Sequence, residues 1–159
     1  MRAALAALLV GASSPPAAQA DARLVEVVRL TQDGFGDSAR TVVGRMLAAT
    51  ARTDRLYPEV LYTVALVAAN HEDRRLYLQR VVVEYAQSDW ADDAILQLAQ
   101  LDYAADNPAG TVQHVTRLLN DYPSSALTAP AALWGARAAY EQRNPTLACQ
   151  WAARGIAAA

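Results

Sequence analysis

The chain has 159 residues, of which 53% are hydrophobic and 19% are charged, and its formal net charge at pH 7 is −2. This length suits one domain with a substantial core and is short for two. The weakly acidic balance offers no basic surface for phosphate groups, so nucleic acid is excluded as an expected partner.

Residues 1–20 differ in composition from the rest of the chain. Arg2 gives a positive start, residues 3–12 are apolar, and a polar run ends in Ala18-Gln19-Ala20. This order is typical of a secretory signal peptide with an Ala-x-Ala cleavage site. We therefore expect a signal peptide cleaved after Ala20, and a periplasmic or secreted domain over residues 21–159. No apolar stretch reaches the roughly 20 residues of a membrane span, so no span is expected.

A 37-residue repeat organises the remaining chain. When residues 80–119 are aligned with residues 117–156, the identical pairs include Tyr85/Tyr122, Asn107/Asn144, Pro108/Pro145 and Arg117/Arg154. The same step places turns near residues 33, 70, 107 and 144. A fixed period of this kind indicates a repeat architecture, in which each unit packs on its neighbours.

Each of these turns separates two segments with helical periodicity. In chain order, helices are predicted over residues 22–32, 37–52, 57–70, 72–85, 90–106, 109–121, 127–142 and 146–157. Pro108 and Pro145 suit the first turn of a helix, where a missing N–H costs nothing. Ser88 and Ser125 lie in links between helices and are available to cap the helix that follows. The chain is therefore expected to be all-α.

The repeated unit has a recurring pattern of small and aromatic residues. One copy has Ala94, Leu98, Ala99 and Tyr103 before Asn107-Pro108, and the next has Ala131, Gly135, Ala136 and Tyr140 before Asn144-Pro145. Over residues 22–158 the pattern resembles tetratricopeptide repeats, whose usual unit has about 34 residues. Links with Tyr-Pro-x-Ser are similar to those of the periplasmic Tol-Pal coordinator and of the repeat lipoprotein of the β-barrel assembly machinery.

The resemblance implies a right-handed α-solenoid of about four antiparallel helix hairpins, with a concave groove that holds a partner. Small residues such as Gly135 are expected to let paired helices approach closely. The same resemblance implies a role in the cell envelope, for example in outer membrane assembly.

The sequence contains no motif that indicates an enzyme. It has no glycine-rich phosphate loop and no H-E-x-x-H, G-x-S-x-G or C-x-x-C motif. The cluster His71-Glu72-Asp73 follows a turn, where solvated charges are a simpler interpretation than metal ligands. Cys149, the only cysteine, is equivalent to Val112 and is expected to be buried rather than to act as a nucleophile with His114. We expect no catalysis, no cofactor and no metal.

In the first helix of each hairpin, the face that does not pack into the core is expected to be open. In the predicted helix 90–106, Asp93, Gln97 and Gln100 are spaced four and three residues apart and so share one face. In the next unit, 37 residues later, Trp134 and Arg137 correspond to Gln97 and Gln100. In the previous unit, 37 residues earlier, the corresponding residues are Val60 and Thr63. These seven residues are the candidates for a partner-binding groove.

Trp134 and Arg137 are the strongest of these candidates, because tryptophan and arginine often anchor interfaces. An alternative of equal weight is that Trp134 covers the core of the last hairpin. Trp90 is equivalent to Leu127 near the start of a helix and is expected to be a packing residue.

Together, these patterns favour a non-catalytic scaffold of the bacterial cell envelope that binds a partner protein or peptide. Two alternatives stay open, namely the N-terminal repeat module of a longer cell-wall or division protein, and an exported enzyme. The chain ends in the apolar residues 155–159 with no polar capping helix, although a terminal repeat normally needs one. Truncation at the C-terminus, or a homodimer through the last hairpin, would account for this end.

Overall fold

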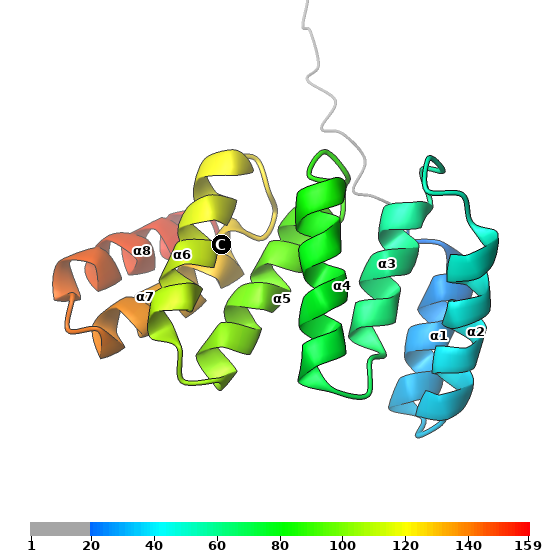
Figure 1. Cartoon of the computed structure of the whole chain (residues 1–159). Helices are drawn as coiled ribbons and strands as arrows, with labels where there is room; N and C mark the ends of the chain where they lie inside the picture. The colour runs from blue at the N-terminus through cyan, green and yellow to red at the C-terminus, as the bar shows by residue number, and fades with distance from the viewer. Residues whose placement is uncertain (1–19) are drawn as a thin grey trace, which may run out of the picture.

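The computed structural model describes residues 20–159, and over that range the chain forms helices and no strand (Figure 1). The prediction of an all-α fold is confirmed. The predicted signal peptide lies outside the described residues, except for Ala20. In the described range, no helix has both the length and the apolar character needed to cross a membrane. The helices are α1 Ala22–Gln32, α2 Gly36–Ala49, α3 Tyr57–Leu66, α4 His71–Glu84, α5 Ala91–Ala104, α6 Pro108–Asp121, α7 Thr128–Glu141 and α8 Pro145–Ala157.

The helices pack against one another in chain order. Each helix contacts the next one, and in addition α1 contacts α3 and α5 contacts α7. Figure 1 shows the resulting row, with α1 and α2 at one end and α7 and α8 at the other. One hydrophobic cluster extends from α3 to α8, and a second joins α1, α2 and α3. Because Val60 belongs to the second cluster and its neighbour Leu61 to the first, α3 connects the two.

The turns before α4, α6 and α8 are built alike. An asparagine (Asn70, Asn107 or Asn144) caps each helix, and its side-chain oxygen accepts a hydrogen bond from a backbone N–H of the first turn at 2.8, 3.1 and 3.1 Å, respectively. Such caps satisfy N–H groups that have no partner within the helix. Pro108 and Pro145 stand in the first turns of α6 and α8, as predicted.

Residues that repeat along the sequence also connect successive helix pairs. Arg117 and Arg154 each donate a hydrogen bond from Nη2 to a backbone carbonyl of the preceding even-numbered helix, at 3.3 and 2.9 Å. Tyr85 and Tyr122 each donate from the hydroxyl group to a backbone carbonyl of the preceding link, at 3.2 and 2.7 Å. The identity of these residues in successive units thus has a structural reason.

Expectations about other single residues have mixed outcomes. The close approach at Gly135 is confirmed, because a Cβ there would lie 2.4 Å from Cε3 of Trp151. Ser125 Oγ accepts a hydrogen bond from a backbone N–H at the start of α7, whereas Ser88 Oγ is buried and has no hydrogen-bond partner among the described residues. The burial expected for Cys149 is wrong, since this residue is exposed. It lies on α8, on the side that the other described helices leave uncovered.

Candidate interaction site

The predicted groove residues of α5 and α7 are placed at or near the surface. Asp93, Gln97 and Gln100 are half-buried on α5, and on α7 Trp134 is half-buried while Arg137 is exposed. They therefore remain accessible in part to a partner.

The open face expected in α3 is wrong for Val60 and Thr63. Val60 is fully buried, and Thr63 is only 3% exposed. The reason is that α1 packs against α3 and shares a hydrophobic cluster with Val60. The repeat step also differs here, because α3 begins at Tyr57, 34 residues before α5 begins at Ala91, whereas α7 begins 37 residues after α5. A 37-residue step therefore pairs α3 with α5 in the wrong register, although Glu59 and Thr63, two of the positions given by the 34-residue step, are buried as well.

With the 34-residue step, the positions of α3 that match the three α5 residues are Glu59, Thr63 and Leu66. All three line a hollow of about 370 Å³, which we call the apolar hollow. The wall opposite α3 is formed by α1. The complete lining is Ala20, Leu24, Val25, Val28, Arg29, Gln32, Glu59, Tyr62, Thr63, Leu66 and Trp90.

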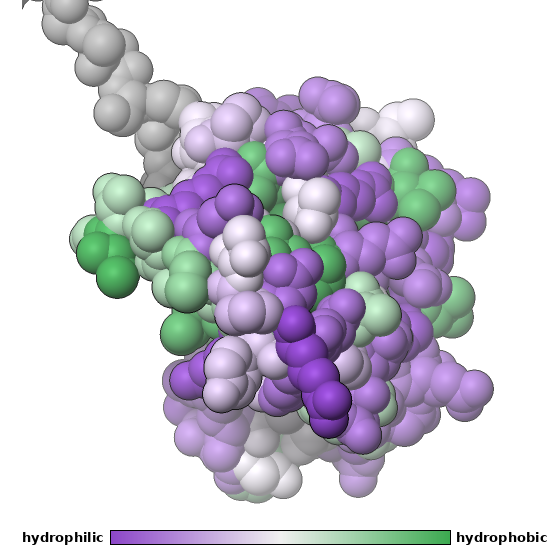
Figure 2. All heavy atoms as spheres, turned by 90° about the vertical axis from the view of Figure 1, so that its left-hand side faces the viewer, coloured by the Kyte–Doolittle hydropathy of each residue, from purple (hydrophilic) through white to green (hydrophobic). Residues whose placement is uncertain are grey.

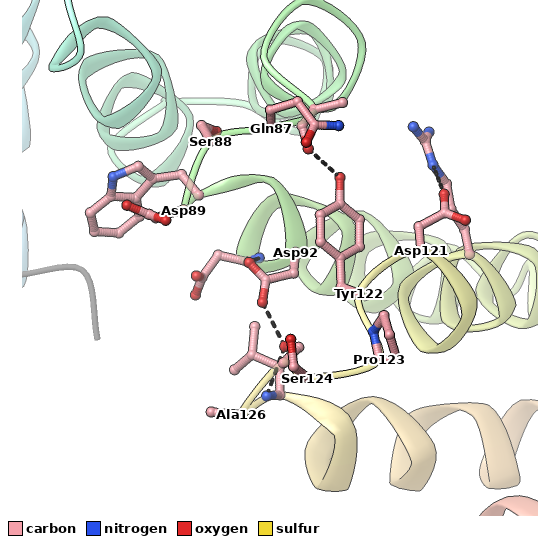
Figure 3. A pocket seen from close by; sticks show the side chains of 15 residues that line it. Gln87, Ser88, Asp89, Asp92, Asp121, Tyr122, Pro123, Ser124 and Ala126 are labelled. Carbon is pink, nitrogen blue, oxygen red and sulfur yellow. Dashed lines mark hydrogen bonds and ion pairs between the residues drawn. The ribbon is translucent and has the colours of Figure 1, made fainter. Parts of the chain in front are cut away.

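A larger hollow, of about 820 Å³, lies between the link 85–90 and the link 122–127 (Figure 3). We call it the acidic hollow because four aspartates line it: Asp89, Asp92, Asp93 and Asp121. Figure 3 shows the side chain of Asp92 directed at the second link and that of Tyr122 directed at the first. The polar part of this lining is completed by Gln87, Ser88, Arg117, Tyr122, Ser124 and Ser125.

Hydrogen bonds hold the two sides of the acidic hollow in place. The hydroxyl group of Ser125 donates to Asp92 Oδ2, and the hydroxyl group of Tyr122 donates to the carbonyl oxygen of Ala86 at 2.7 Å. Asp92 also accepts from the backbone N–H of Asp93 at 3.1 Å. The links are therefore joined across the hollow, which fixes the direction of the Asp92 carboxylate before any partner arrives.

The charges in this hollow are unbalanced. Its arginine, Arg117, pairs with Asp121 at 3.4 Å, and in residues 20–159 no ion pair involves Asp89, Asp92 or Asp93. Burial, together with the charge of Asp92, raises the pKa of Asp93 to about 6. A site with carboxylates held close together and partly out of water favours the arrival of a cation.

Trp90 borders both hollows. Its ring packs against the ring of Tyr62, with centroids 5.3 Å apart and an interplanar angle of 30°. Burial, together with the charges of Asp93 and Asp92, raises the pKa of the Tyr62 hydroxyl group. The packing role predicted for Trp90 is confirmed, because this residue lies against the larger hydrophobic cluster. Its position between two hollows was not predicted, although the sequence flanks it with carboxylates in the run Asp89-Trp90-Ala91-Asp92-Asp93.

Trp134 and Arg137 lie together, but they line neither hollow. The Arg137 guanidinium is 5.3 Å from the centre of the Trp134 ring, and this ring meets Tyr103 edge-on, with centroids 5.2 Å apart. Trp134 also packs against the larger hydrophobic cluster. The alternative that Trp134 covers the core is thus supported. The side of Trp134 that lies against Arg137 stays partly open.

A further charged cluster joins α4, α5 and α6. Asp102, only 4% exposed, lies 2.8 Å from Nη2 of Arg75 and 3.2 Å from Nε2 of His114. Burial lowers the pKa of His114 against the opposing effect of the Asp102 charge. This cluster connects three helices, whereas Cys149 is exposed on α8 and His71 is exposed at the start of α4. In the part of the chain that the structure describes, no three His, Cys, Asp or Glu side chains are grouped to hold a metal ion.

The two hollows and Trp90 between them are the features that best suit binding of a partner. Trp90 is aromatic, its neighbours on one side are carboxylates, and its neighbours on the other side are mainly apolar. No protein-family model matches the chain, and no curated protein matches its sequence.

Proposed function

We propose that this chain is a non-catalytic interaction module of the bacterial cell envelope. It is exported, loses a signal peptide after Ala20, and forms a right-handed solenoid of tetratricopeptide-like hairpins that binds a segment of a partner protein. Recurring caps, links and interhelical arginines support the repeat interpretation.

The observation that carries the proposal is the placement of Trp90 between an acidic and an apolar hollow. An arginine or lysine of the partner enters the acidic hollow, where Asp89, Asp92 and Asp93 have no cationic partner within residues 20–159. The next apolar side chain enters the apolar hollow between α1 and α3. Trp90 contacts both, since an aromatic ring attracts a cation on its face and also packs against apolar groups.

Binding of short peptides tests this proposal. The probe is a capped pentapeptide with one arginine between leucines, and the control peptide has glutamate in place of arginine. NMR chemical-shift perturbation at pH 7.5 and low salt gives the dissociation constants. We expect the arginine peptide to bind at least about tenfold more tightly, and its affinity to fall with added salt because charge attraction is screened.

Variants locate the site on the protein. Asp92→Asn combined with Asp93→Asn should weaken binding of the arginine peptide by about tenfold, and Trp90→Ala should weaken it further. Asp106→Asn is the matched control, since Asp106 is exposed and its left-handed φ of 56° is well tolerated by asparagine. Equal binding of the arginine and glutamate peptides, or unchanged binding by the double variant, would show that the proposal is wrong.

The pH dependence of binding is a separate check. Because the pKa of Asp93 is about 6 in the free protein, this carboxyl group becomes neutral as the pH falls from 7.5 to 5. Affinity for the arginine peptide should therefore decrease over this range. In Asp93→Asn the decrease should be smaller, and an identical pH profile would contradict the role given to Asp93.

A homodimer through the α7–α8 end is a second proposal about partners. Leu133, Tyr140 and Ile156 are exposed there, and Figure 2 looks onto this end. The view shows mostly hydrophilic side chains, with hydrophobic groups at the left edge and others in the centre and at the right edge. Sedimentation velocity tests this: wild type should be a dimer and Ile156→Asp a monomer, whereas a monomeric wild type at high concentration would reject it.

A further inference from the structure

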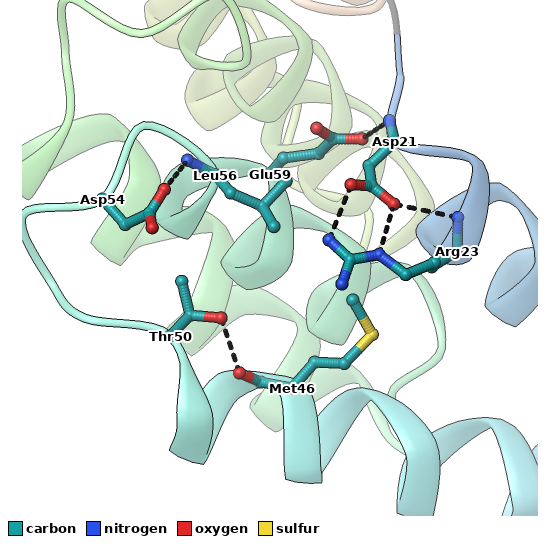
Figure 4. Close-up of polar contacts among 7 residues, drawn as sticks. All are labelled: Asp21, Arg23, Met46, Thr50, Asp54, Leu56 and Glu59. Atoms are coloured by element: carbon teal, nitrogen blue, oxygen red, sulfur yellow. Dashed lines mark hydrogen bonds and ion pairs between the residues drawn. The ribbon is translucent and has the colours of Figure 1, made fainter.

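The backbone nitrogen of Asp21 donates a hydrogen bond to a buried carboxylate. Glu59 on α3 is 6% exposed, and its Oε1 lies 2.7 Å from the Asp21 nitrogen (Figure 4). Among the described residues this is the one hydrogen bond that reaches the Glu59 carboxylate. Asp21 is also the residue that follows the Ala18-Gln19-Ala20 cleavage motif.

With the peptide bond between Ala20 and Asp21 intact, this arrangement is electrostatically poor. A buried carboxylate needs an opposite charge or several hydrogen bonds, and a single amide supplies neither. Burial raises the pKa of Glu59, and this effect outweighs the hydrogen bond from the Asp21 nitrogen, which lowers the pKa; the charge of the Asp21 side chain raises it again. The side chain of Asp21 does not help, because it caps α1 and pairs with Arg23 at 2.8 Å.

We propose that cleavage before Asp21 completes this site, by turning the amide nitrogen into an ammonium group that pairs with Glu59. Water adds across the Ala20–Asp21 peptide bond, Ala20 leaves as a carboxylate, and the Asp21 nitrogen becomes a protonated primary amine. The catalyst is a peptidase of the export pathway, so this inference rests on the proposed export. The nitrogen already lies at hydrogen-bond distance from Glu59, so the new ion pair needs no rearrangement of α1 or α3.

The pair would also affect the apolar hollow. Ala20 lines this hollow, as do Glu59 and several residues of α1. Cleavage removes Ala20 from the rim, and the ammonium–carboxylate pair holds α1 against α3. Maturation and formation of the binding surface are thereby coupled.

Proteins with defined N-termini test the ion pair without relying on export. One form begins at Asp21, released from a cleavable fusion, and the other keeps residues 1–20. Both hydrophobic clusters lie within residues 24–151, so the shorter form keeps the whole core. At pH 7 we expect the form that begins at Asp21 to unfold at a temperature about 4 °C higher.

Glu59→Gln is the decisive control, because it keeps a hydrogen-bond acceptor and removes the charge. In this variant the two N-terminal forms should unfold at the same temperature. Acetylation of the Asp21 amine in the wild type should likewise remove the difference. A difference that persists in Glu59→Gln, or the absence of any difference in the wild type, would overturn the inference.

The pH range of the effect follows from the two ionisable partners. An α-amino group has an ordinary pKa of about 8, and pairing raises it, so the stabilisation is complete below pH 8 and is lost as the pH rises further. At low pH, Glu59 becomes neutral and the stabilisation disappears again. Asp21, Arg23, Arg29 and Tyr62 also lie in this region, but they are common to both forms. A difference unchanged at pH 10 would contradict the ion pair.

Export of the full chain in a bacterium with a periplasm tests the cleavage. An exported protein whose mass corresponds to residues 21–159 supports the inference. An exported protein with another N-terminus would overturn the inference of cleavage before Asp21, while the proposal of export would still hold. A chain that stays in the cytoplasm overturns the export proposal itself.

Discussion

Replacement of Gly135 by alanine tests how closely α7 and α8 are packed. The added Cβ would lie 2.4 and 2.6 Å from two ring carbons of Trp151 and 2.7 Å from Cγ1 of Val115. These distances are shorter than contacts between carbon atoms allow, and neither a tryptophan ring nor a buried valine can fold away like the end of a flexible side chain. The helices would therefore have to move apart.

The magnitude is the balance of two effects. Forcing extra volume into a packed core costs about 1–3 kcal/mol, and contacts with two separate side chains place Gly135→Ala near the upper limit. Alanine is also better than glycine in a helix by about 1 kcal/mol. We therefore expect a net loss of about 2 kcal/mol in the free energy of unfolding, measured by urea titration with circular dichroism at 222 nm.

Gly44→Ala is the matched control. Gly44 is exposed in the middle of α2, and a Cβ there would meet no atom within 4 Å. Only the propensity effect remains, so this variant should be more stable than wild type by up to about 1 kcal/mol. If Gly135→Ala were as stable as Gly44→Ala, the close packing of Trp151 on α7 would be refuted. Trp151→Leu should in turn reduce the cost of Gly135→Ala, because it removes the ring that the Cβ meets.

Three further substitutions are expected to change stability in defined directions. Asn107→Ala removes the cap of α6 and should cost about 1 kcal/mol in urea unfolding; a neutral result would contradict the capping role. Asp102→Ala leaves Arg75 and His114 without their shared carboxylate and should cost about 2 kcal/mol, less than a fully buried pair because both partners are partly exposed. Asp93→Asn should stabilise by about 1 kcal/mol at pH 7, and this gain should vanish below pH 4. The reason is that the raised pKa of Asp93 makes its charged form unfavourable in the folded protein. As the pH falls through 6, Asp93 becomes neutral and the stability of wild type approaches that of Asp93→Asn. A gain that remains at pH 4 would refute this explanation.

Much of the fold could be predicted because single residue types mark its turns. Asparagine followed by proline combines a side-chain cap with a fixed first turn, and the structure has this arrangement at Asn107 and Asn144. The position of the tyrosines and arginines in the repeat could also be predicted. Their partners could not, because each one is a backbone carbonyl, and every residue has one.

The register of α3 could not be predicted for a different reason. Eight of its ten residues are buried, so its sequence has no polar face to mark the phase of the helix. The 34-residue distance between the starts of α3 and α5 is visible only once both helix starts are known. Of the acidic hollow, only Asp93 was among the predicted groove residues, because most of the lining comes from two links, where helical periodicity carries no information.

Residues that are identical between repeats have a structural role, whereas some residues that differ between repeats line the acidic hollow. The identical Asn107 and Asn144 cap helices, and the identical Arg117 and Arg154 connect successive helix pairs. Trp90, in contrast, corresponds to Leu127 in the next unit, and the exposed Asp89 corresponds to Ala126. Asp89 and Trp90 are thus not needed to propagate the repeat. The same holds for Asp93, which corresponds to Pro130 and whose charge is disfavoured by burial. A charge that costs stability and plays no part in the packing of the repeat is best explained by a ligand, which is why we infer the binding site at Trp90 rather than on the repeated surface.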